Sequence, residues 1–223
     1  MKHMPLRPAL RFADLPRLHA GAPMPAHLPP HAPGMRIGLF GGTFNPPHEG
    51  HVLVSEIALK QLRLDCIWWI VTPGNPLKEN SGLPPQALRI EAARRLADHP
   101  GIDITGFEAE IGTRFTYDTV EYLARRCKDV DFVWIMGADN LSQFHRWQRW
   151  RDIARLAPIA VIDRPGSTLK AVNSRAGQFL ARYRHSESEA SLLAGGPTPA
   201  FIFLHGKRSE ASSTELRSRG AGL

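Results

Sequence analysis

Short apolar runs that end at glycine or proline recur along the chain and alternate with stretches of helical spacing. The runs predict strands at 36–40, 66–72, 102–104, 132–136, 159–162 and 201–204. The other stretches predict helices at about 50–62, 85–97, 117–127 and 147–156, and one more that begins near 212. Because strands that alternate with helices pair in parallel and are covered on both faces, the pattern predicts an α/β fold with a doubly wound parallel sheet. Ligands of such sheets bind beyond the carboxyl ends of the strands, so we expect the functional site in the loops that follow them.

The first 34 residues differ in composition from the rest of the chain. They hold eight of its 19 prolines and four of its ten histidines. They contain neither serine nor threonine, and they lack the continuous apolar core of a secretory signal. This composition predicts a disordered leader at 1–34, followed by a single domain at 35–223. Residues 167–199 are poorly patterned, and we expect one helix there, near 169–183.

Charge and cysteine content narrow the classes of function. The 223 residues carry a formal net charge of +7, which suits a polyanionic partner such as a nucleic acid, an anionic membrane or a phosphorylated small molecule. The two cysteines, Cys66 and Cys127, form no motif of a disulfide scaffold, which favours a reducing cytoplasm. The apolar runs are far shorter than the ~20 residues that a membrane helix needs. We therefore expect no membrane-spanning segment.

The loop after the first expected strand, at 41–51, reads GGTFNPPHEGH. Its adjacent glycines, Gly41 and Gly42, let a phosphate group approach the main chain closely, and the helix start that follows favours an anion. His48 and His51 lie three positions apart, so at a helix start both imidazoles can converge on one phosphate group. A tight turn with two exposed histidines would explain the histidine pair alone, but not the whole string. The loop therefore predicts a phosphate site.

Three further loops carry residues that suit a nucleotide. Lys78, after the second strand, could offset phosphate charge, although a lone lysine is more often a solvated surface group. Asp139, two residues after Gly137, suits the ribose hydroxyls or, equally, the cap of the next helix. The string SSTELR at 212–217 places hydroxyl groups at a helix start and Arg217 one turn later, which suits phosphates but is also typical of an ordinary helix cap.

The string at 41–51 resembles the nucleotidyltransferase signature with its His-x-Gly-His core. Its residue sequence most resembles that of bacterial nicotinate-nucleotide adenylyltransferases. The string at 212–217 resembles the second signature of this family, and the resemblance covers almost all of 35–219. It implies a Rossmann-like nucleotidyltransferase fold and a place in NAD biosynthesis. The implied reaction joins ATP and nicotinate mononucleotide, its two partners, to give deamido-NAD and pyrophosphate without a covalent enzyme intermediate. Mg²⁺ is the implied cofactor, held through the ATP phosphates and not by a metal site of the protein.

The resemblance also implies roles for individual residues. Those implied to act in catalysis are His48, His51, Lys78 and Arg217. Those implied to bind ATP are Gly41, Gly42, Thr43, Phe44, Gly137, Asp139, Ser212, Ser213 and Thr214. Those implied to hold the nicotinate nucleotide are Thr116, Trp147 and Arg164, although on physics alone Thr116 suits a helix cap and Arg164 a surface turn. Arg89 is a further candidate for the phosphates, Trp150 is assigned to packing, and Phe115 stands where the family usually has tyrosine.

Other interpretations stay open. Adenylyltransferases that use nicotinamide mononucleotide or phosphopantetheine, and cytidylyltransferases, share the His-x-Gly-His core. Three features argue against phosphopantetheine and against cytidylyl transfer: the residue sequence of 41–47, the second signature and Trp147. The sequence does not separate the acid form of the pyridine nucleotide from the amide form. A basic nucleic-acid-binding protein would explain the charge and the arginines between aromatic residues at 144–151, but it leaves both signatures unexplained. Both a monomer and a homo-oligomer are compatible with the sequence.

Overall fold

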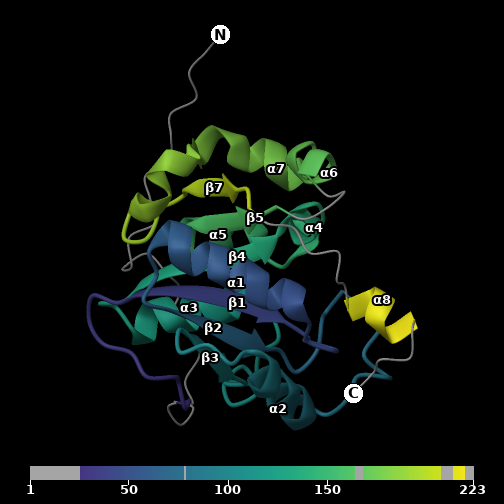
Figure 1. Ribbon diagram of the computed structural model, residues 1–223. Helices are drawn as coiled ribbons and strands as arrows, with labels where there is room; N and C mark the ends of the chain where they lie inside the picture. The colour runs from purple at the N-terminus through teal and green to yellow at the C-terminus, as the bar shows by residue number, and fades with distance from the viewer. Residues whose placement is uncertain (1–25, 78, 164–167, 207–212, 219–223) are drawn as a thin grey trace.

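The computed structural model describes residues 26–77, 79–163, 168–206 and 213–218 (Figure 1). Its strands pair in parallel and form one seven-stranded sheet in the order β3-β2-β1-β4-β5-β7-β6. The strands are β1 (Arg36–Gly42), β2 (Cys66–Val71), β3 (Ile102–Thr105), β4 (Asp131–Gly137), β5 (Ile159–Ile162), β6 (Arg184–His185) and β7 (Phe201–Leu204). The predicted doubly wound parallel sheet is confirmed.

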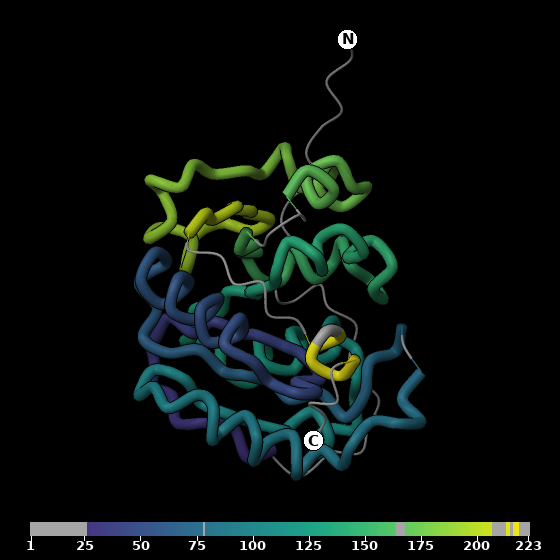
Figure 2. Tube along the Cα trace, turned by 45° about the vertical axis from the view of Figure 1, so that its right-hand side comes forward, coloured from purple at the N-terminus to yellow at the C-terminus, as the bar shows by residue number. Residues whose placement is uncertain are grey.

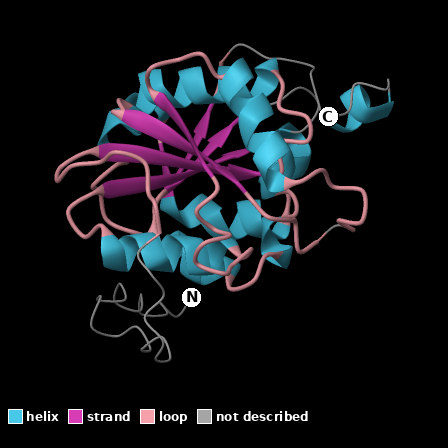
Figure 3. Ribbon diagram, turned by 90° about the horizontal axis from the view of Figure 1, so that it is seen from below, coloured by secondary structure: helices cyan, strands magenta, loops and turns pink. Residues whose placement is uncertain are grey.

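Helices connect the strands and cover the sheet. The longer ones are α1 (Glu49–Leu62), α2 (Gln86–Leu96), α3 (Thr116–Arg126) and α5 (Trp150–Leu156). The shorter ones are α4 (Ala138–Leu141), α6 (Thr168–Val172), α7 (Arg175–Leu180) and α8 (Ser213–Ser218), with the 3₁₀ turns η2 (Phe144–Arg146), η3 (Ala181–Tyr183) and η4 (Glu187–Leu192). Figure 3 shows helices on both faces of the twisted sheet. No helix among these described segments is long and apolar enough to cross a membrane.

The middle of the sheet is buried on both faces, and the sequence explains why. All six residues of β2, which reads CIWWIV, are buried. Successive side chains of this strand point into two separate cores, because side chains alternate along a strand. Trp68 packs into the core that contains Val120 of α3, and Trp69 into the core that contains Val54 of α1. A central parallel strand therefore requires the continuous apolar run that the sequence shows.

The strand order determines where a ligand can enter. From β1 the chain continues to β2 and β3 on one side, and β4 pairs with the other side of β1. The register pairs Phe40 with Ile135, so the loops after Gly42 and Gly137 leave the sheet side by side. The carboxyl ends of β1 and β4 thus flank a topological switch point, where folds of this class bind their ligands.

Part of the predicted leader is packed against the domain. Ala26 and Leu28 lie against the core cluster that includes α3, and the N–H of Gly34 donates to the carbonyl oxygen of Asp129 at 2.6 Å. The prediction of disorder therefore does not hold for 26–34, because these apolar side chains find a partner surface that composition alone does not reveal. Residues 1–25, the remainder of the predicted leader, lie outside the described residues.

The helix predicted near 169–183 is broken into α6, α7 and the turn η3. Ser174 explains the break, because its hydroxyl caps α7 by accepting from the N–H of Gly177 at 3.1 Å and donates to the carbonyl oxygen of Ala171 at 2.7 Å. The two helices also approach closely, since a Cβ on Gly177 would lie 2.4 Å from the Ala171 oxygen. A single helix is therefore wrong, and the two-residue strand β6 is absent from the prediction.

Candidate active site

A pocket of about 430 Å³ opens at the carboxyl ends of the central strands. Its walls come from the loops after β1 and β2, the first turns of α1, the residues before α3, the junction of β4 and α4, the segment 146–148, and α8. Figure 1 shows α4 and α8 on the same side of the molecule. The pocket thus occupies the switch point created by the strand order.

Of the predicted site residues that the structure describes, all except Arg89 line this pocket. They are Gly41, Gly42, Thr43, Phe44, His48, His51, Thr116, Gly137, Asp139, Trp147, Ser213, Thr214 and Arg217. The other three, Lys78, Arg164 and Ser212, lie outside the described residues. Segments from the beginning and the end of the domain therefore meet in one cavity, while the individual roles of these residues stay predictions.

The start of the loop at 41–51 is closely packed. A Cβ on Gly41 would lie 2.8 Å from the ring of Trp134, so a larger residue would not fit without a shift of that ring. Phe44 has a φ of 47°, and its ring is held in the core, where it stacks on Trp69 with the ring centroids 4.9 Å apart. We therefore expect Phe44 to meet a nucleotide through its main chain and not through its ring.

His48 and His51 are held by the main chain at the start of α1. His48 is the N-cap residue, and its Nδ1 accepts from the N–H of Gly50 at 3.1 Å. The Nδ1 of His51 accepts from the N–H of His48 at 3.2 Å, and the two ring centroids are 3.9 Å apart. A neutral ring that accepts at Nδ1 carries its hydrogen on Nε2, so both imidazoles present their N–H groups away from these main-chain contacts. Two adjacent donors on a pocket wall suit a phosphate group that gains charge during a reaction.

Helix α8 closes the pocket against the same loop. Ser213 Oγ donates to the carbonyl oxygen of Pro46 at 2.9 Å, and Arg217 Nη1 donates to the carbonyl oxygen of Asn45. Figure 2 shows α8, in yellow, next to the N-terminal end of α1. Arg217 Nη2 lies 3.3 Å from Thr214 Oγ1, so a guanidinium group and a hydroxyl group stand together on this wall. The structure therefore joins the two segments that the sequence analysis identifies as signatures.

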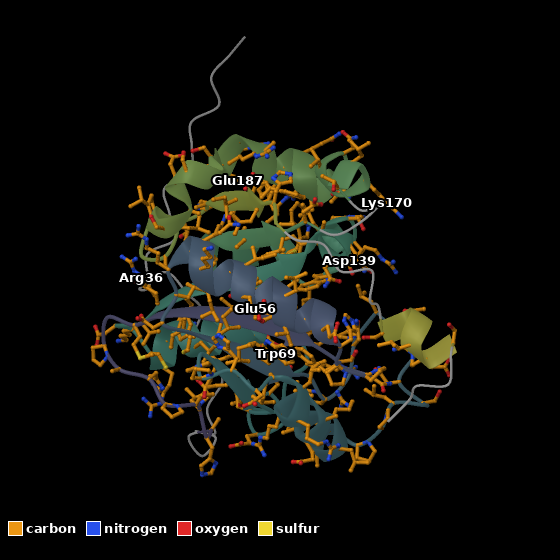
Figure 4. The ribbon with its side chains drawn as sticks, viewed as in Figure 1. Arg36, Glu56, Trp69, Asp139, Lys170 and Glu187 are labelled. Atoms are coloured by element: carbon orange, nitrogen blue, oxygen red, sulfur yellow. The ribbon has the colours of Figure 1, made fainter. Side chains whose placement is uncertain are left out.

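Asp139 lies in the first turn of α4, directly after the carboxyl end of β4. Figure 4 places it on the side of the molecule where α8 lies. The N-cap residue of α4 is Gly137, and no side-chain hydrogen bond caps this helix. Asp139 is therefore not the helix cap that its type suggests, and it lines the pocket, as a residue that binds ribose must.

Thr116 and Trp147 line the pocket from two different elements. Thr116 is the first residue of α3, and the N-cap residue is Phe115, so the alternative role of Thr116 as a cap does not hold. The ring of Trp147 makes edge contacts with Phe144 and Trp134, with centroid distances of 5.2 and 6.1 Å. These contacts fix an aromatic ring in the wall, which suits the binding of another flat ring.

Arg89 is not among the residues that line the pocket, contrary to the prediction for it. It is 1% exposed, and its guanidinium donates to the carbonyl oxygens of Thr43 at 2.7 Å, Thr72 at 2.8 Å and Pro84 at 2.9 Å. Burial lowers the pKa of Arg89. Because buried carbonyl groups of irregular main chain need donors, Arg89 holds the loops after β1 and β2 together. Trp150 is confirmed as a core residue.

Several pocket residues are absent from the sequence prediction. They include Thr72, Glu108, Arg114, Asn140, Arg146 and Gln148. Glu108 is buried, its Oε1 accepts from Thr119 Oγ1 at 2.5 Å, and burial raises its pKa. It lies in the loop after the four-residue strand β3, and an acid in a loop gives no sequence signal of burial.

The chain is similar in sequence to known proteins over most of its length. The family described as cytidylyltransferase-like matches residues 39–219. A probable nicotinate-nucleotide adenylyltransferase of Bradyrhizobium sp. (strain ORS 278) is 55% identical over 184 residues, which cover 82% of this chain and 96% of that protein. A protein of the same name from Methylorubrum extorquens is 57% identical over 185 residues, which cover 83% of this chain and 100% of that protein.

The fold also has a counterpart among solved structures. It is similar to Plasmodium falciparum nicotinic acid mononucleotide adenylyltransferase complexed with NaAD, with a TM-score of 0.62. The match covers 82% of this chain and 83% of that chain at 15% sequence identity, so it concerns the fold alone.

Proposed function

Because the chain belongs to the cytidylyltransferase-like family, and within it to the nicotinate-nucleotide adenylyltransferases, we propose that it transfers the adenylyl group of ATP to nicotinate mononucleotide. The products are deamido-NAD and pyrophosphate, and the reaction belongs to NAD biosynthesis. The observation that carries the proposal is the meeting of two segments at one pocket, the histidines at the start of α1 and the helix α8 with Arg217. Both segments offer the hydrogen-bond donors that phosphate groups require.

The two histidines suit the phosphorus that reacts. An oxygen of the 5′-phosphate of nicotinate mononucleotide attacks the α-phosphorus of ATP in line, and the bond from that phosphorus to the pyrophosphate oxygen breaks. Both the nucleophile and the leaving group are ionised phosphates, so positioning and charge neutralisation suffice and no general base is needed. His48 and His51 donate from Nε2 to oxygens of the α-phosphate, where negative charge grows as the new bond forms.

The leaving pyrophosphate faces α8. Arg217 can donate N–H groups to its oxygens, and the hydroxyl of Thr214 stands beside them. The hydroxyl of Ser213 is already engaged with Pro46, so Ser213 fixes α8 and would meet ATP through its main chain. Lys78 and Ser212 have the same assignment from the family resemblance.

Mg²⁺ fits this pocket as an ion held through the substrate. Among the described residues, no group of three His, Cys, Asp or Glu side chains could hold a metal ion. Mg²⁺ commonly keeps several of its waters and binds through substrate phosphates, so the phosphates of ATP would be its main ligands. Bound in that way, the ion would supply positive charge beside the departing phosphates.

The remaining predicted residues suit the ribose of ATP and the pyridine nucleotide. Asp139 offers carboxylate oxygens to the ribose hydroxyls of ATP, next to the close main-chain approach that Gly137 permits. Trp147 offers its ring to the pyridine, with Thr116 on the neighbouring wall and Arg164 assigned by resemblance. Phe115 has no hydroxyl group, so a contact that the usual tyrosine makes through its hydroxyl is absent in this chain.

The release of pyrophosphate from Mg-ATP tests the proposal with three acceptors in parallel: nicotinate mononucleotide, nicotinamide mononucleotide and phosphopantetheine. We expect the highest kcat/KM with the nicotinate form. A preference for the amide form would correct the substrate, and activity with phosphopantetheine alone would overturn the assignment to pyridine nucleotides. If no acceptor supports release, adenylyl transfer is wrong, and salt-sensitive binding to an arbitrary oligonucleotide becomes the function to test.

A further inference from the structure

Trp69 connects the middle of the sheet to the start of α1, and the mechanism above does not use it. It is a fully buried residue of β2, and Figure 4 shows it beside α1. Neither Trp69 nor its partner Ser55 is among the described residues that line the pocket, whereas His51 is. Two separate sets of contacts lead from Trp69 to His51.

The first set consists of two hydrogen bonds in series. Nε1 of Trp69 donates to Ser55 Oγ at 2.8 Å, and Ser55 Oγ donates to the carbonyl oxygen of His51 at 3.0 Å. An indole N–H group can only donate, so the hydroxyl of Ser55 must accept from it and keeps its single hydrogen for His51. Ser55 is fully buried, so bulk water replaces neither bond. Trp69 thereby sets the direction of the hydrogen bond that Ser55 makes to the main chain of His51.

The second set of contacts is made by aromatic rings. The indole ring of Trp69 stacks on Phe44, with the centroids 4.9 Å apart and an angle of 15° between the ring planes. Phe44 lies 4.8 Å from the imidazole of His51, and Trp69 lies 5.8 Å from it. Phe40 lies 5.9 Å from the same imidazole and 6.3 Å from Trp69. The imidazole therefore lies against a group of buried rings, and Trp69 contacts both phenylalanines of that group.

The two sets of contacts act on different parts of His51. The hydrogen bond from Ser55 holds its carbonyl group in the first turn of α1, and the aromatic rings limit the positions of its imidazole. The N–H of His48 holds a third point, Nδ1, at 3.2 Å. Together these constraints determine where Nε2 of His51 lies. This is the atom that the proposed mechanism places against the α-phosphate.

We propose that Trp69 is a positioning residue for His51, which it holds through Ser55 at the main chain and through Phe44 at the ring. The inference rests on the proposed function, in which His51 donates from Nε2 to the α-phosphate. Tryptophan suits this position because it offers both an N–H donor and a large flat surface. A donor stabilises the transition state only where it meets the oxygen that gains charge, and a displacement of about 1 Å can lower a rate about 10²-fold.

Two tryptophans that follow each other in β2 provide a matched pair of variants. Trp69→Phe removes the N–H donor and part of the stacked surface. Trp68→Phe makes the same chemical change at an equally buried residue that packs into the other core. We expect Trp69→Phe to lower kcat by about tenfold or more and to leave both KM values within about twofold, as expected for an interaction made only in the transition state. Both variants should melt at a lower temperature than the wild type, but Trp68→Phe should keep its kcat.

Ser55→Ala tests the hydrogen bonds separately from the rings. It removes the hydroxyl between Trp69 and His51 and leaves Trp69 stacked on Phe44. We expect a smaller fall in kcat than in Trp69→Phe, again with unchanged KM values. A wild-type kcat in folded Ser55→Ala would contradict the connection through Ser55.

The comparison of the two tryptophan variants can also contradict the proposal. If Trp69→Phe and Trp68→Phe lower kcat equally, Trp69 contributes to packing alone and the positioning role is wrong. A rise in either KM at an unchanged kcat would contradict it as well. If Trp69→Phe does not fold, the result with Ser55→Ala decides.

NMR spectroscopy of the protein without substrates separates this proposal from the proposed function. At a pH where the imidazole is neutral, its ¹⁵N shifts show which nitrogen carries the hydrogen, and His51 of the wild type should carry it on Nε2. We expect both tautomers of His51 in Trp69→Phe, because the released ring can turn, and the wild-type spectrum in Trp68→Phe. A single, unchanged tautomer in Trp69→Phe would overturn the positioning role. A wild type that turns over no nicotinate mononucleotide contradicts the proposed function instead, and this comparison then tests Trp69 separately.

Discussion

The orientation of His48 and His51 depends on two hydrogen bonds from the main chain. Nδ1 is the acceptor in both hydrogen bonds, so neither ring can turn without breaking one of them. The loss of one such hydrogen bond at a helix start costs about 1 kcal/mol of stability. The two donors proposed to act on the α-phosphate are therefore fixed before a substrate arrives. Such preorganised donors are the most effective way to stabilise charge that develops in a transition state.

Replacement of His51 tests this role at the scale of one residue. We expect His51→Ala to lower kcat by roughly 10²–10³, because one donor to the α-phosphate is lost. A suitable control is His99→Ala, since His99 also accepts from a main-chain N–H, that of Gly101, but lies outside the pocket. Pyrophosphate release gives kcat and thermal unfolding gives stability. A kcat near the wild-type value in folded His51→Ala would contradict the assignment.

Arg89 should matter for stability and not directly for phosphate binding. Arg89→Met removes the donor from four carbonyl groups in two loops, and we expect the free energy of unfolding to fall by about 2–5 kcal/mol. Arg94→Met, on the exposed face of the same helix, should change it by less than ~0.5 kcal/mol. Urea unfolding of both variants gives the comparison. Equal stabilities would contradict the structural role of Arg89.

Whether a residue lines the pocket was predictable where the signal is contiguous in the sequence. The glycines and histidines of 41–51 form one string, and their place on the pocket wall follows from the strand before it and the helix after it. The contacts of Arg89 and Glu108 depend on partners that folding brings together, such as Thr43, which lies 46 positions from Arg89. Neither residue type nor spacing carries that information.

At the scale of elements, the strands were the most predictable parts because burial on both faces leaves a continuous apolar run. The run predicted at 66–72 becomes β2, Cys66–Val71. The break between α6 and α7 was not predictable, since Ser174 also lies 3.3 Å from the carbonyl oxygen of Leu141 on α4, a contact made only in the folded chain. Strand β6 has two residues, which is too short for a periodic pattern.

The structure assigns α8 to the pocket and not to the core. Within the described residues, neither core cluster contains a residue of α8. We therefore expect removal of residues 213–223 to lower kcat/KM for ATP by roughly 10²-fold or more, because the charged phosphates lose the donors of Arg217. The melting temperature should shift by less than about 2–4 °C. Scanning calorimetry and pyrophosphate release measure the two effects, and an unchanged kcat/KM would contradict the placement of α8.

At the scale of the whole molecule, the sheet separates two cores, and the segment 26–34 belongs to one of them. Ala26, Leu28 and Met35 pack against the cluster that includes α3, and His31 contacts Trp68 of β2 with a centroid distance of 5.6 Å. The pocket is built at the carboxyl edge of the sheet from other segments. Stability and activity should therefore respond differently to changes at this end of the chain.

Two truncated chains test that separation. A chain that begins at residue 35 should melt at least about 2–4 °C below one that begins at residue 26, the shift expected for a loss of ~1 kcal/mol in a domain of this size. Both should keep the kcat of the full chain, because no residue of 26–34 lines the pocket. Equal melting temperatures would contradict the packing of this segment.

The fate of the α-phosphate of ATP tests adenylyl transfer most directly. ATP labelled at the α-phosphate or at the γ-phosphate is incubated with Mg²⁺, nicotinate mononucleotide and the full chain, and the products are separated. Attack at the α-phosphorus places the α-label in the dinucleotide and the γ-label in pyrophosphate. The γ-label in the nicotinate nucleotide, or in inorganic phosphate without a dinucleotide, would contradict the proposed reaction.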